Sequence, residues 1–390
     1  MIKIFKSLPV RLISAVIIGI LVGLYANEAI ISIVLPIKYI LGQIIFFIVP
    51  LIIIGFIAPS ITKLGANASR LLVIAIVLAY VSSIGAALFA TGAGYAIIPH
   101  LNIADNSGAV RELSAMIFKL DIPQIMPVMS ALVLSVFIGL AAVWNKSERF
   151  IGLLDEFQAI VISLVIKVII PILPFFIGFT FAVLAYEGSI TNQLPVFIVV
   201  ILLVMVGHFV WLSLLYGLAG LYSGKNPLRV LQHYGPAYLT AVGTMSSAAT
   251  LPVALECARR SDILRSDTVS FGIPLFANIH LCGSVLTETF FVMTVSQVLY
   301  GSLPSFGTML LFCLLLGIFA IGAPGVPGGT VMASLGLIIS VLGFDEVGTA
   351  LMLTIFALQD SFGTACNVTG DGALTLIISS YNEKKGQSLN

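Results

Sequence analysis

Four polar side chains that could bind a cation or an ammonium group recur near the C-terminal end of the chain. They are Asp360, Thr364, Asn367 and Asp371, set in an otherwise apolar stretch. At about 100° per residue, a helix places all four within about 60° of one another, in a stripe about 16 Å long. Two carboxylates at membrane depth cost at least ~2.5–3.5 kcal/mol each, so we expect them to face a cation, an ammonium group or water.

A carboxylate pair that caps loops near the membrane surface is the alternative interpretation of these acids. Asp360, however, lies eleven residues after Thr349, near the start of the same apolar run. That distance places it well inside the membrane, which favours a functional site.

A third acid and a histidine lie in an earlier apolar stretch. Glu288 follows His280 by eight residues, about 80° of rotation on a helix, so the two side chains would lie on adjacent faces. Burial favours the neutral form of a carboxyl group, which makes Glu288 a candidate proton carrier. For His280 two interpretations stay open: a functional group, or a packed side chain bonded to a carbonyl at a helix break.

Two further stretches are rich in hydroxyls or in glycine and proline. Residues 244–252 hold four hydroxyl side chains and a proline, and residues 322–329 hold four glycines and two prolines. Neither can be an ordinary spanning helix, because backbone groups at membrane depth must be satisfied inside protein or beside water. Ser246 and Ser247 sit where a substrate carboxylate would need donors. The alternative is that their hydroxyls bond within a helix.

The composition shows what must surround these residues. Hydrophobic residues make up 59% of the 390 positions, charged residues 9%, and mean hydropathy is +1.14. A soluble domain carries roughly 25% charged residues, so lipid must be the main solvent. The formal charge of +1 indicates neither nucleic acid nor an acidic partner. The four cysteines have neither zinc-ligand spacing nor a disulfide framework, and we interpret them mainly as packing residues.

The apolar runs predict eight membrane spans, since a spanning helix needs about 20 apolar residues. The first follows basic residues without a cleavage site, so we interpret it as a span and not as a signal peptide. The predicted spans are 9–26, 39–58, 71–97, 124–143, 159–185, 195–222, 271–299 and 349–379. Two stretches, 226–260 and 303–344, are broken and are predicted to enter and return on one side.

The lysines and arginines give the orientation. With both termini inside, fourteen of the eighteen fall in inside connections: Lys3, Lys6, Arg11, Lys63, Arg70, Lys146, Arg149, Lys225, Arg229, Arg259, Arg260, Arg265, Lys384 and Lys385. Cytoplasmic connections carry the excess of basic residues, which supports this topology with both termini cytoplasmic.

The helices after the two broken stretches also look interrupted, at 278–284 and at 363–371. A hairpin followed by a broken helix therefore occurs twice, and paired interruptions in two halves point to a transporter's binding site. Two unrelated re-entrant loops are the alternative.

Three runs together resemble the dicarboxylate/amino acid:cation symporters, the glutamate transporter homologues. They are Ser-Ser-Ala-Ala-Thr-Leu-Pro at 246–252, Gly-Val-Pro-Gly-Gly at 325–329 and the stripe at 360–371, whose Asn-Val-Thr-Gly-Asp is the most specific. The order of spans and hairpins agrees over nearly the whole chain, which would be a divergent member.

The resemblance implies a fold and a mechanism. The fold would be an all-α polytopic membrane protein with eight transmembrane helices, two re-entrant helical hairpins and inverted repeats. A scaffold (1–62 and 124–186) would form a homotrimer in the cell membrane. A transport domain (71–98 and 193–380) would move as an elevator, with the second hairpin as a gate.

The resemblance also assigns roles. Asp360 resembles the acid that holds the substrate amino group, Asn367 the amide that meets its carboxylate, and Asp371 a sodium ligand. Glu288 stands where some members carry a proton on a glutamate. The implied substrate-binding set is Ser246, Ser247, Val326, Gly328, Asp360, Thr364 and Asn367. The implied cation-coupling set is His280, Glu288, Asn367 and Asp371, with Asn367 and Asp371 as the sodium ligands.

Three departures from the family pattern bear on substrate and coupling. Members that take acidic substrates place an arginine at the position of Gly363 or of Met245, and neither is present here. A second substrate carboxylate would then lose roughly 1.5–3 kcal/mol of charged hydrogen bonding, so we expect a neutral or polar amino acid. The alternative is an acidic amino acid or a C4 dicarboxylate. The family's Asn-Met-Asp-Gly-Thr reads His-Leu-Cys-Gly-Ser at 280–284, and Cys282 replaces a sodium-ligating Asp.

Other function classes fit less well. A channel would need a continuous pore lined by rings of like side chains, whereas these acids line one discontinuous site. An intramembrane hydrolase would need a nucleophile motif around Ser246 or Ser247, and none is present. The sequence contains no complete phosphate-loop motif, so it gives no indication of an ATP-driven pump. We therefore expect a non-enzyme whose only accessory species are coupling ions, Na⁺ and/or H⁺.

Overall fold

The computed structural model describes residues 8–65, 70–101, 111, 113, 116–188 and 190–385, and this part of the chain forms helices and no strand. Lys3, Lys6 and both chain ends lie outside the described residues, as do the side chains of Lys63 and Lys385. The predicted position of the termini is therefore not addressed by the described part.

One group of helices packs mainly within itself. α1 lies along α6, and α2 contacts α4, α5 and α6. At the α1–α6 crossing a Cβ on Gly19 would lie 2.2 Å from the Gly178 carbonyl oxygen, so the glycine allows the close approach. The members are α1 (Leu8–Tyr25), α2 (Glu28–Gly65), α4 (Val128–Trp144), α5 (Glu148–Leu164), the π-helical turn η2 (Val165–Ile169) and α6 (Ile170–Glu187).

The second group surrounds the C-terminal helix. α12 packs against α15 and α3, and α15 also contacts α7, α9 and α11. The members are α3 (Arg70–Ile97), the 3₁₀ turn η1 (Ile98–His100), α7 (Ile190–Ser223), α8 (Leu228–Leu231), α9 (Gly235–Thr244), α10 (Ser247–Arg259), α11 (Ser266–Ile279), α12 (Cys282–Tyr300), α13 (Phe306–Gly322), α14 (Gly329–Ser340) and α15 (Glu346–Lys385).

Five segments of the described chain are long and apolar enough to cross a membrane. They are Glu28–Pro59, Arg70–His100, Glu148–Glu187, Val196–Ser223 and Ser266–Tyr300. Each corresponds to one of the eight predicted spans. The first and fourth predicted spans form shorter apolar helices, Val10–Tyr25 and Val133–Trp144, and α15 carries the polar stripe. The multi-pass character is thus confirmed, and the count of eight stays a prediction.

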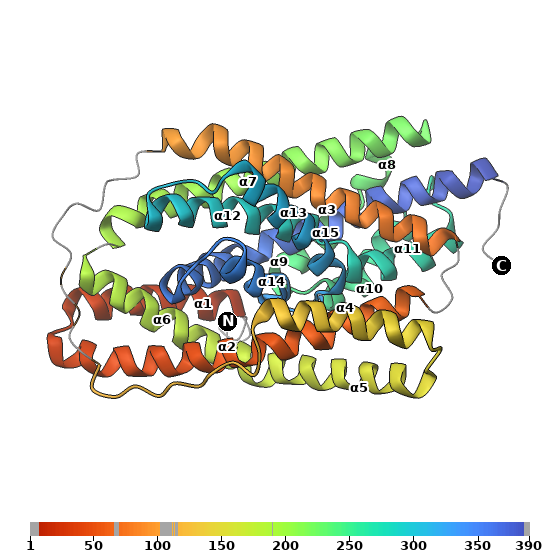
Figure 1. The fold of residues 1–390 in the computed structure, drawn as a ribbon. Coiled ribbons are helices and arrows are strands. Elements are labelled where there is room, and N and C mark those ends of the chain that lie inside the picture. The colour runs from red at the N-terminus through yellow and green to blue at the C-terminus, as the bar shows by residue number, and fades with distance from the viewer. Residues whose placement is uncertain are drawn as a thin grey trace.

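The broken stretches form helical hairpins that enter from opposite ends of the molecule (Figure 1). α9 and α10 pack as the two arms of the first, which leads into α11 at the right of the view. α13 and α14 form the second, which leaves α12 and joins α15 at the left. Their tips are short: Met245 and Ser246 in the first, residues 323–328 in the second.

Of the two interruptions predicted in the following helices, one is correct and one is wrong. α11 ends at Ile279 and α12 begins at Cys282, so a break separates them as expected. α15, in contrast, is one continuous helix through 363–371. That run contains no proline, and its Gly, Thr and Asn residues each lower helix propensity by about 1 kcal/mol or less, which packing on four neighbouring helices outweighs.

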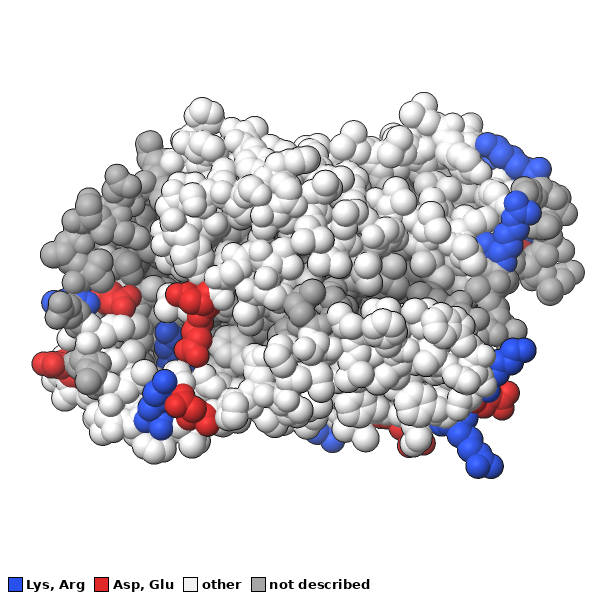
Figure 2. Space-filling view, in the orientation of Figure 1, with Lys and Arg blue, Asp and Glu red and all other residues white. Residues whose placement is uncertain are grey.

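Most charged side chains on the face shown in Figure 2 gather toward its two ends, a few lie along the lower edge, and other residues form the broad middle. This is the distribution of a protein whose middle is surrounded by hydrocarbon, where a charged side chain is costly.

The α12–α15 crossing gives a test of the packing. A Cβ on Gly283 would lie 2.4 Å from the Cys366 Cβ and 2.4 Å from the Gly363 carbonyl oxygen. Gly283→Ala is therefore expected to destabilise the fold by about 1–3 kcal/mol through overpacking. Thermal unfolding in detergent measures this. Gly217→Ala on α7, where a Cβ meets nothing within 4 Å, is the matched control; equal melting of both variants would contradict the close crossing.

Candidate substrate and cation site

The tips of the two hairpins meet each other. Ser246 caps α10: its Oγ accepts from the Ala249 N–H at 3.2 Å and donates to the Gly325 carbonyl at 2.5 Å. The Ala248 N–H donates to the same carbonyl at 3.3 Å. Met245, just before the tip, has a left-handed φ of 53° that ends α9 sharply. The two hydroxyl- and glycine-rich stretches therefore form one junction.

The predicted donors Ser246 and Ser247 are both buried at this junction. The hydroxyl of Ser246 is engaged by the second hairpin tip and by the Ala249 N–H at the start of α10, which is an N-cap contact and not a bond to a carbonyl within a helix. A role toward a substrate carboxylate stays a prediction for both serines.

Asp360 faces the second hairpin from α15. Its carboxylate is buried, and Oδ2 accepts from the Gly328 N–H at 2.7 Å, at the N-terminal end of α14. A helix N-terminus stabilises a negative charge. Thr364, one turn further along α15, is buried on the same face of the helix. Since a carboxylate has about four acceptor positions, the contact leaves others for a ligand.

Asn367 holds the beginning of α12. Its Oδ1 accepts from the Gly283 N–H at 2.7 Å and the Ser284 N–H at 3.1 Å, and its Nδ2 donates to Ser284 Oγ at 2.8 Å. The amide thus satisfies N–H groups freed by the break before Cys282. One amide hydrogen remains, so the predicted contact with a substrate carboxylate would use that hydrogen.

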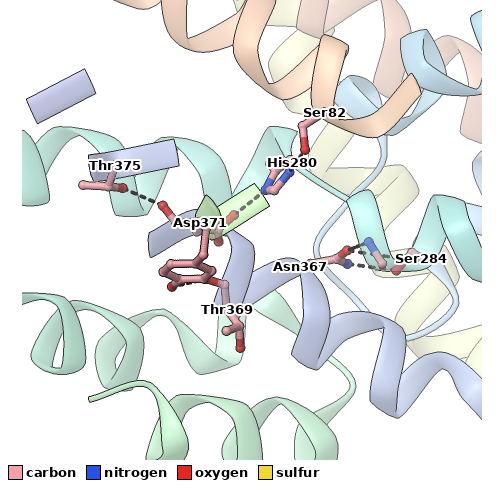
Figure 3. A network of polar contacts seen from close by, with 9 residues as sticks. Ser82, His280, Ser284, Asn367, Thr369, Asp371 and Thr375 are labelled. Carbon is pink, nitrogen blue, oxygen red and sulfur yellow. Dashed lines mark hydrogen bonds and ion pairs between the residues drawn. The ribbon is translucent and has the colours of Figure 1, made fainter. Parts of the chain in front are cut away.

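His280 lies in the break between α11 and α12 and joins two other helices (Figure 3). Its Nδ1 is 2.9 Å from Asp371 Oδ1 on α15, and its Nε2 is 2.9 Å from Ser82 Oγ on α3. The ring is 0% exposed and Asp371 1%. Both ring nitrogens face side chains, so the interpretation of a histidine bonded to a carbonyl is wrong.

Glu288 is separate from this cluster. It is 0% exposed and accepts a short hydrogen bond through Oε1 from Ser334 on α14. The spacing of His280 and Glu288 predicted two side chains on adjacent faces of one helix. That prediction is wrong, because the break at 280–281 leaves His280 outside the helix that carries Glu288.

The positions where an arginine would stand leave little room for one. A Cβ on Gly363 would lie 3.3 Å from the Ser284 Cα and 3.4 Å from its backbone nitrogen. Met245 is 2% exposed. Cys282 is fully buried, and a Cβ on Gly370 would lie 3.3 Å from its sulfur. The close packing of α12 on α15 therefore leaves little room for an arginine side chain at position 363.

A cavity of about 670 Å³ opens beside the second hairpin tip. Its walls include Gly325 and Val326 of the tip, Asn278 of α11 and, from the first helix group, Gln158 and Ile162 of α5. Val326, a predicted substrate contact, thus borders an open volume next to the hairpin junction.

Comparison with known proteins decides the family. A family model described as "Sodium:dicarboxylate symporter family" matches residues 8–381. The chain belongs to this family. The resemblance of the hairpin and stripe motifs is thereby confirmed.

Similar proteins among the relatives of this symporter-family chain are excitatory amino acid transporters. Excitatory amino acid transporter 3 of Mus musculus is 30% identical over 166 residues, which are 43% of this chain and 31% of that protein. An excitatory amino acid transporter of Caenorhabditis elegans is 29% identical over 159 residues, 41% and 31% of the two chains. Excitatory amino acid transporter 2 of Mus musculus is 26% identical over 244 residues, 60% and 42%. The matches span less than half the length of each of these relatives.

Three contacts of this symporter-family site were not expected from the sequence. Ser82 binds His280, Ser334 binds Glu288, and the Gly325 carbonyl receives the first hairpin. Each pairs residues separated by at least 46 positions, and a serine in an apolar helix gives no local signal of its partner.

Proposed function

We propose that this chain is a secondary active symporter that imports an amino acid with Na⁺ and/or H⁺. The observation that carries the proposal is the junction of two hairpin tips beside the buried Asp360. A buried carboxylate at the end of a re-entrant hairpin suits an ammonium group that must be bound, occluded and released. A substrate-bound state would use the acceptor positions of Asp360 that Gly328 leaves open.

The proposed mechanism is an elevator, in which the second helix group moves relative to the first. Support comes from the packing, because each group contacts mainly its own members and α14 lies between them. A direct polar contact across the boundary joins Gln43 Nε2 to Glu346 Oε1 at 3.1 Å. On this proposal residues 1–62 and 124–186 are the scaffold of a homotrimer, and 71–98 and 193–380 the transport domain. The cavity beside Val326 would be the release path when the second hairpin opens.

We propose a neutral or polar amino acid as the substrate. The tight packing at Gly363 and the burial of Met245 support this, because neither position offers a cation to a second carboxylate. An acidic amino acid or a dicarboxylate is the second candidate, favoured by the names of the relatives and of the family.

Isosteric amino acids separate these two candidates. Glutamine and glutamate, or asparagine and aspartate, differ by one charge at nearly equal size. The neutral member of a pair is expected to bind roughly 10- to 150-fold more tightly, the equivalent of the lost charged hydrogen bond. Thermal shift of the purified protein against concentration, with and without sodium, measures it. Stronger stabilisation by the acidic member would establish the second candidate.

A further inference from the structure

The ring of His280 fills the space in front of one oxygen of Asp371. It reaches this position from the unwound residues between α11 and α12, with Nδ1 at 2.9 Å from Oδ1 and Nε2 at 2.9 Å from Ser82 Oγ. The ring is packed closely: a Cβ on Gly370 would lie 2.9 Å from its Cε1, and the Phe276 ring meets it edge-on at 6.3 Å. A chain segment from each of three helices, α3, α11 and α15, therefore holds the imidazole in place.

A buried carboxylate next to unwound backbone is the arrangement in which transporters hold a coupling cation. Such a cation would satisfy the carboxylate and connect it to oxygen atoms of neighbouring helices. Here a ring N–H can donate to the Asp371 carboxylate, and the opposite ring nitrogen bonds to the Ser82 oxygen. One side chain of the protein thus makes both connections that the cation would make.

The other expected ligand is also engaged. Asn367 Oδ1 accepts hydrogen bonds from two backbone N–H groups of α12, so this oxygen is already occupied and is not a free ligand for a cation beside Asp371. Among the described residues, Asp371 Oδ2 has no hydrogen-bond partner, and it is the remaining acceptor of this carboxylate. The sequence resemblance places an asparagine of the family where His280 stands.

We propose that His280 is a built-in substitute for a coupling cation at Asp371, so that sodium does not bind at this carboxylate. The inference rests on the proposed symport function and concerns its ion selectivity. His280 is then a selectivity-determining residue: the imidazole occupies the position, and a smaller amide there would open it to sodium.

Thermal unfolding of the purified full-length protein tests this at one pH, with sodium chloride against choline chloride at equal ionic strength. The wild type is expected to show no sodium-specific stabilisation that depends on Asp371, so its response to the two salts is expected to be the same as that of Asp371→Asn. His280→Asn is expected to gain a sodium-specific rise of about 2 °C or more at saturating salt, since an ion that binds only the folded state stabilises it. Ser83→Ala is the matched control: Ser83 is buried next to Ser82 on α3, its hydroxyl has no hydrogen-bond partner among the described residues, and the variant is expected to show no added sodium effect.

Two results would overturn the proposal. One is a sodium-specific rise in the wild type that Asp371→Asn removes, which would place sodium beside His280. The other is a folded His280→Asn protein without any sodium effect, which would make the imidazole a packing group only. If His280→Asn elutes as an aggregate, His280→Gln replaces it, and the comparison of the wild type with Asp371→Asn is made in either case. The amino-acid screen in the same preparation is independent: substrate stabilisation without a sodium effect supports the symporter and this inference, whereas no substrate effect counts against the symporter alone.

Discussion

Asp360→Asn is expected to lower amino-acid uptake at subsaturating substrate by about tenfold or more while the protein remains folded. The asparagine keeps the size of the side chain and an oxygen that can accept from the Gly328 N–H, now 2.7 Å from the carboxylate. It removes the negative charge that an ammonium group requires. Losing a charged hydrogen bond costs about 1.5–3 kcal/mol, which lowers affinity roughly 10- to 150-fold. Uptake of labelled amino acid into proteoliposomes measures the effect.

The control for Asp360 is an acid outside the site. Glu256 on α10 is exposed and forms an ion pair with Arg260, four residues later, at 3.3 Å. Exposed pairs of this kind contribute little, so Glu256→Gln is expected to transport normally. Equal melting temperatures for the wild type and Asp360→Asn would show that the fold is intact. Normal uptake by Asp360→Asn would refute the substrate role of this carboxylate.

Much of the architecture could be predicted from local signals. The apolar runs located the long helices, and the glycine, proline and hydroxyl clusters located both hairpin tips, because such residues cannot continue a lipid-exposed helix. The break at His280 was predicted correctly. The break predicted near Gly363 was wrong, because helix-weakening residues without a proline are held helical by packing on all sides of α15.

The site was predictable as a set of residues but not as a set of contacts. The stripe on α15 follows from helical periodicity, and its members are all buried. Their partners come from other elements: Gly328 for Asp360, the start of α12 for Asn367, and His280 for Asp371. Periodicity determines which residues share a face, whereas tertiary packing determines what that face meets. The stripe consequently bonds to two separate places, the tip of the second hairpin and the junction between α11 and α12, and does not face one open pocket.

Glu288 is the group whose replacement should separate proton coupling from substrate handling. It is fully buried between α12 and α14, with Ser334 on one oxygen and no hydrogen-bond partner on Oε2 among the described residues. Ser334 Oγ also lies 3.0 Å from the Thr330 carbonyl. A protonated Glu288 can donate a hydrogen bond to Ser334 Oγ, and the Ser334 hydroxyl then donates its own hydrogen bond to the Thr330 carbonyl. The surroundings therefore accept both a protonated and an ionised carboxyl group.

If protons drive uptake, Glu288→Gln is expected to lose uptake driven by an inward proton gradient, down to the level of liposomes without protein. Exchange of internal for external amino acid should persist, because glutamine has the shape of the protonated glutamate and can keep the Ser334 contact. Both activities are measured in one proteoliposome preparation, with Glu256→Gln as the control. Proton-driven uptake that survives in Glu288→Gln would exclude this carboxyl group as the carrier. Loss of exchange together with uptake would instead indicate that α14 needs the Glu288–Ser334 contact to close on the substrate, a structural role that Ser334→Ala would then reproduce.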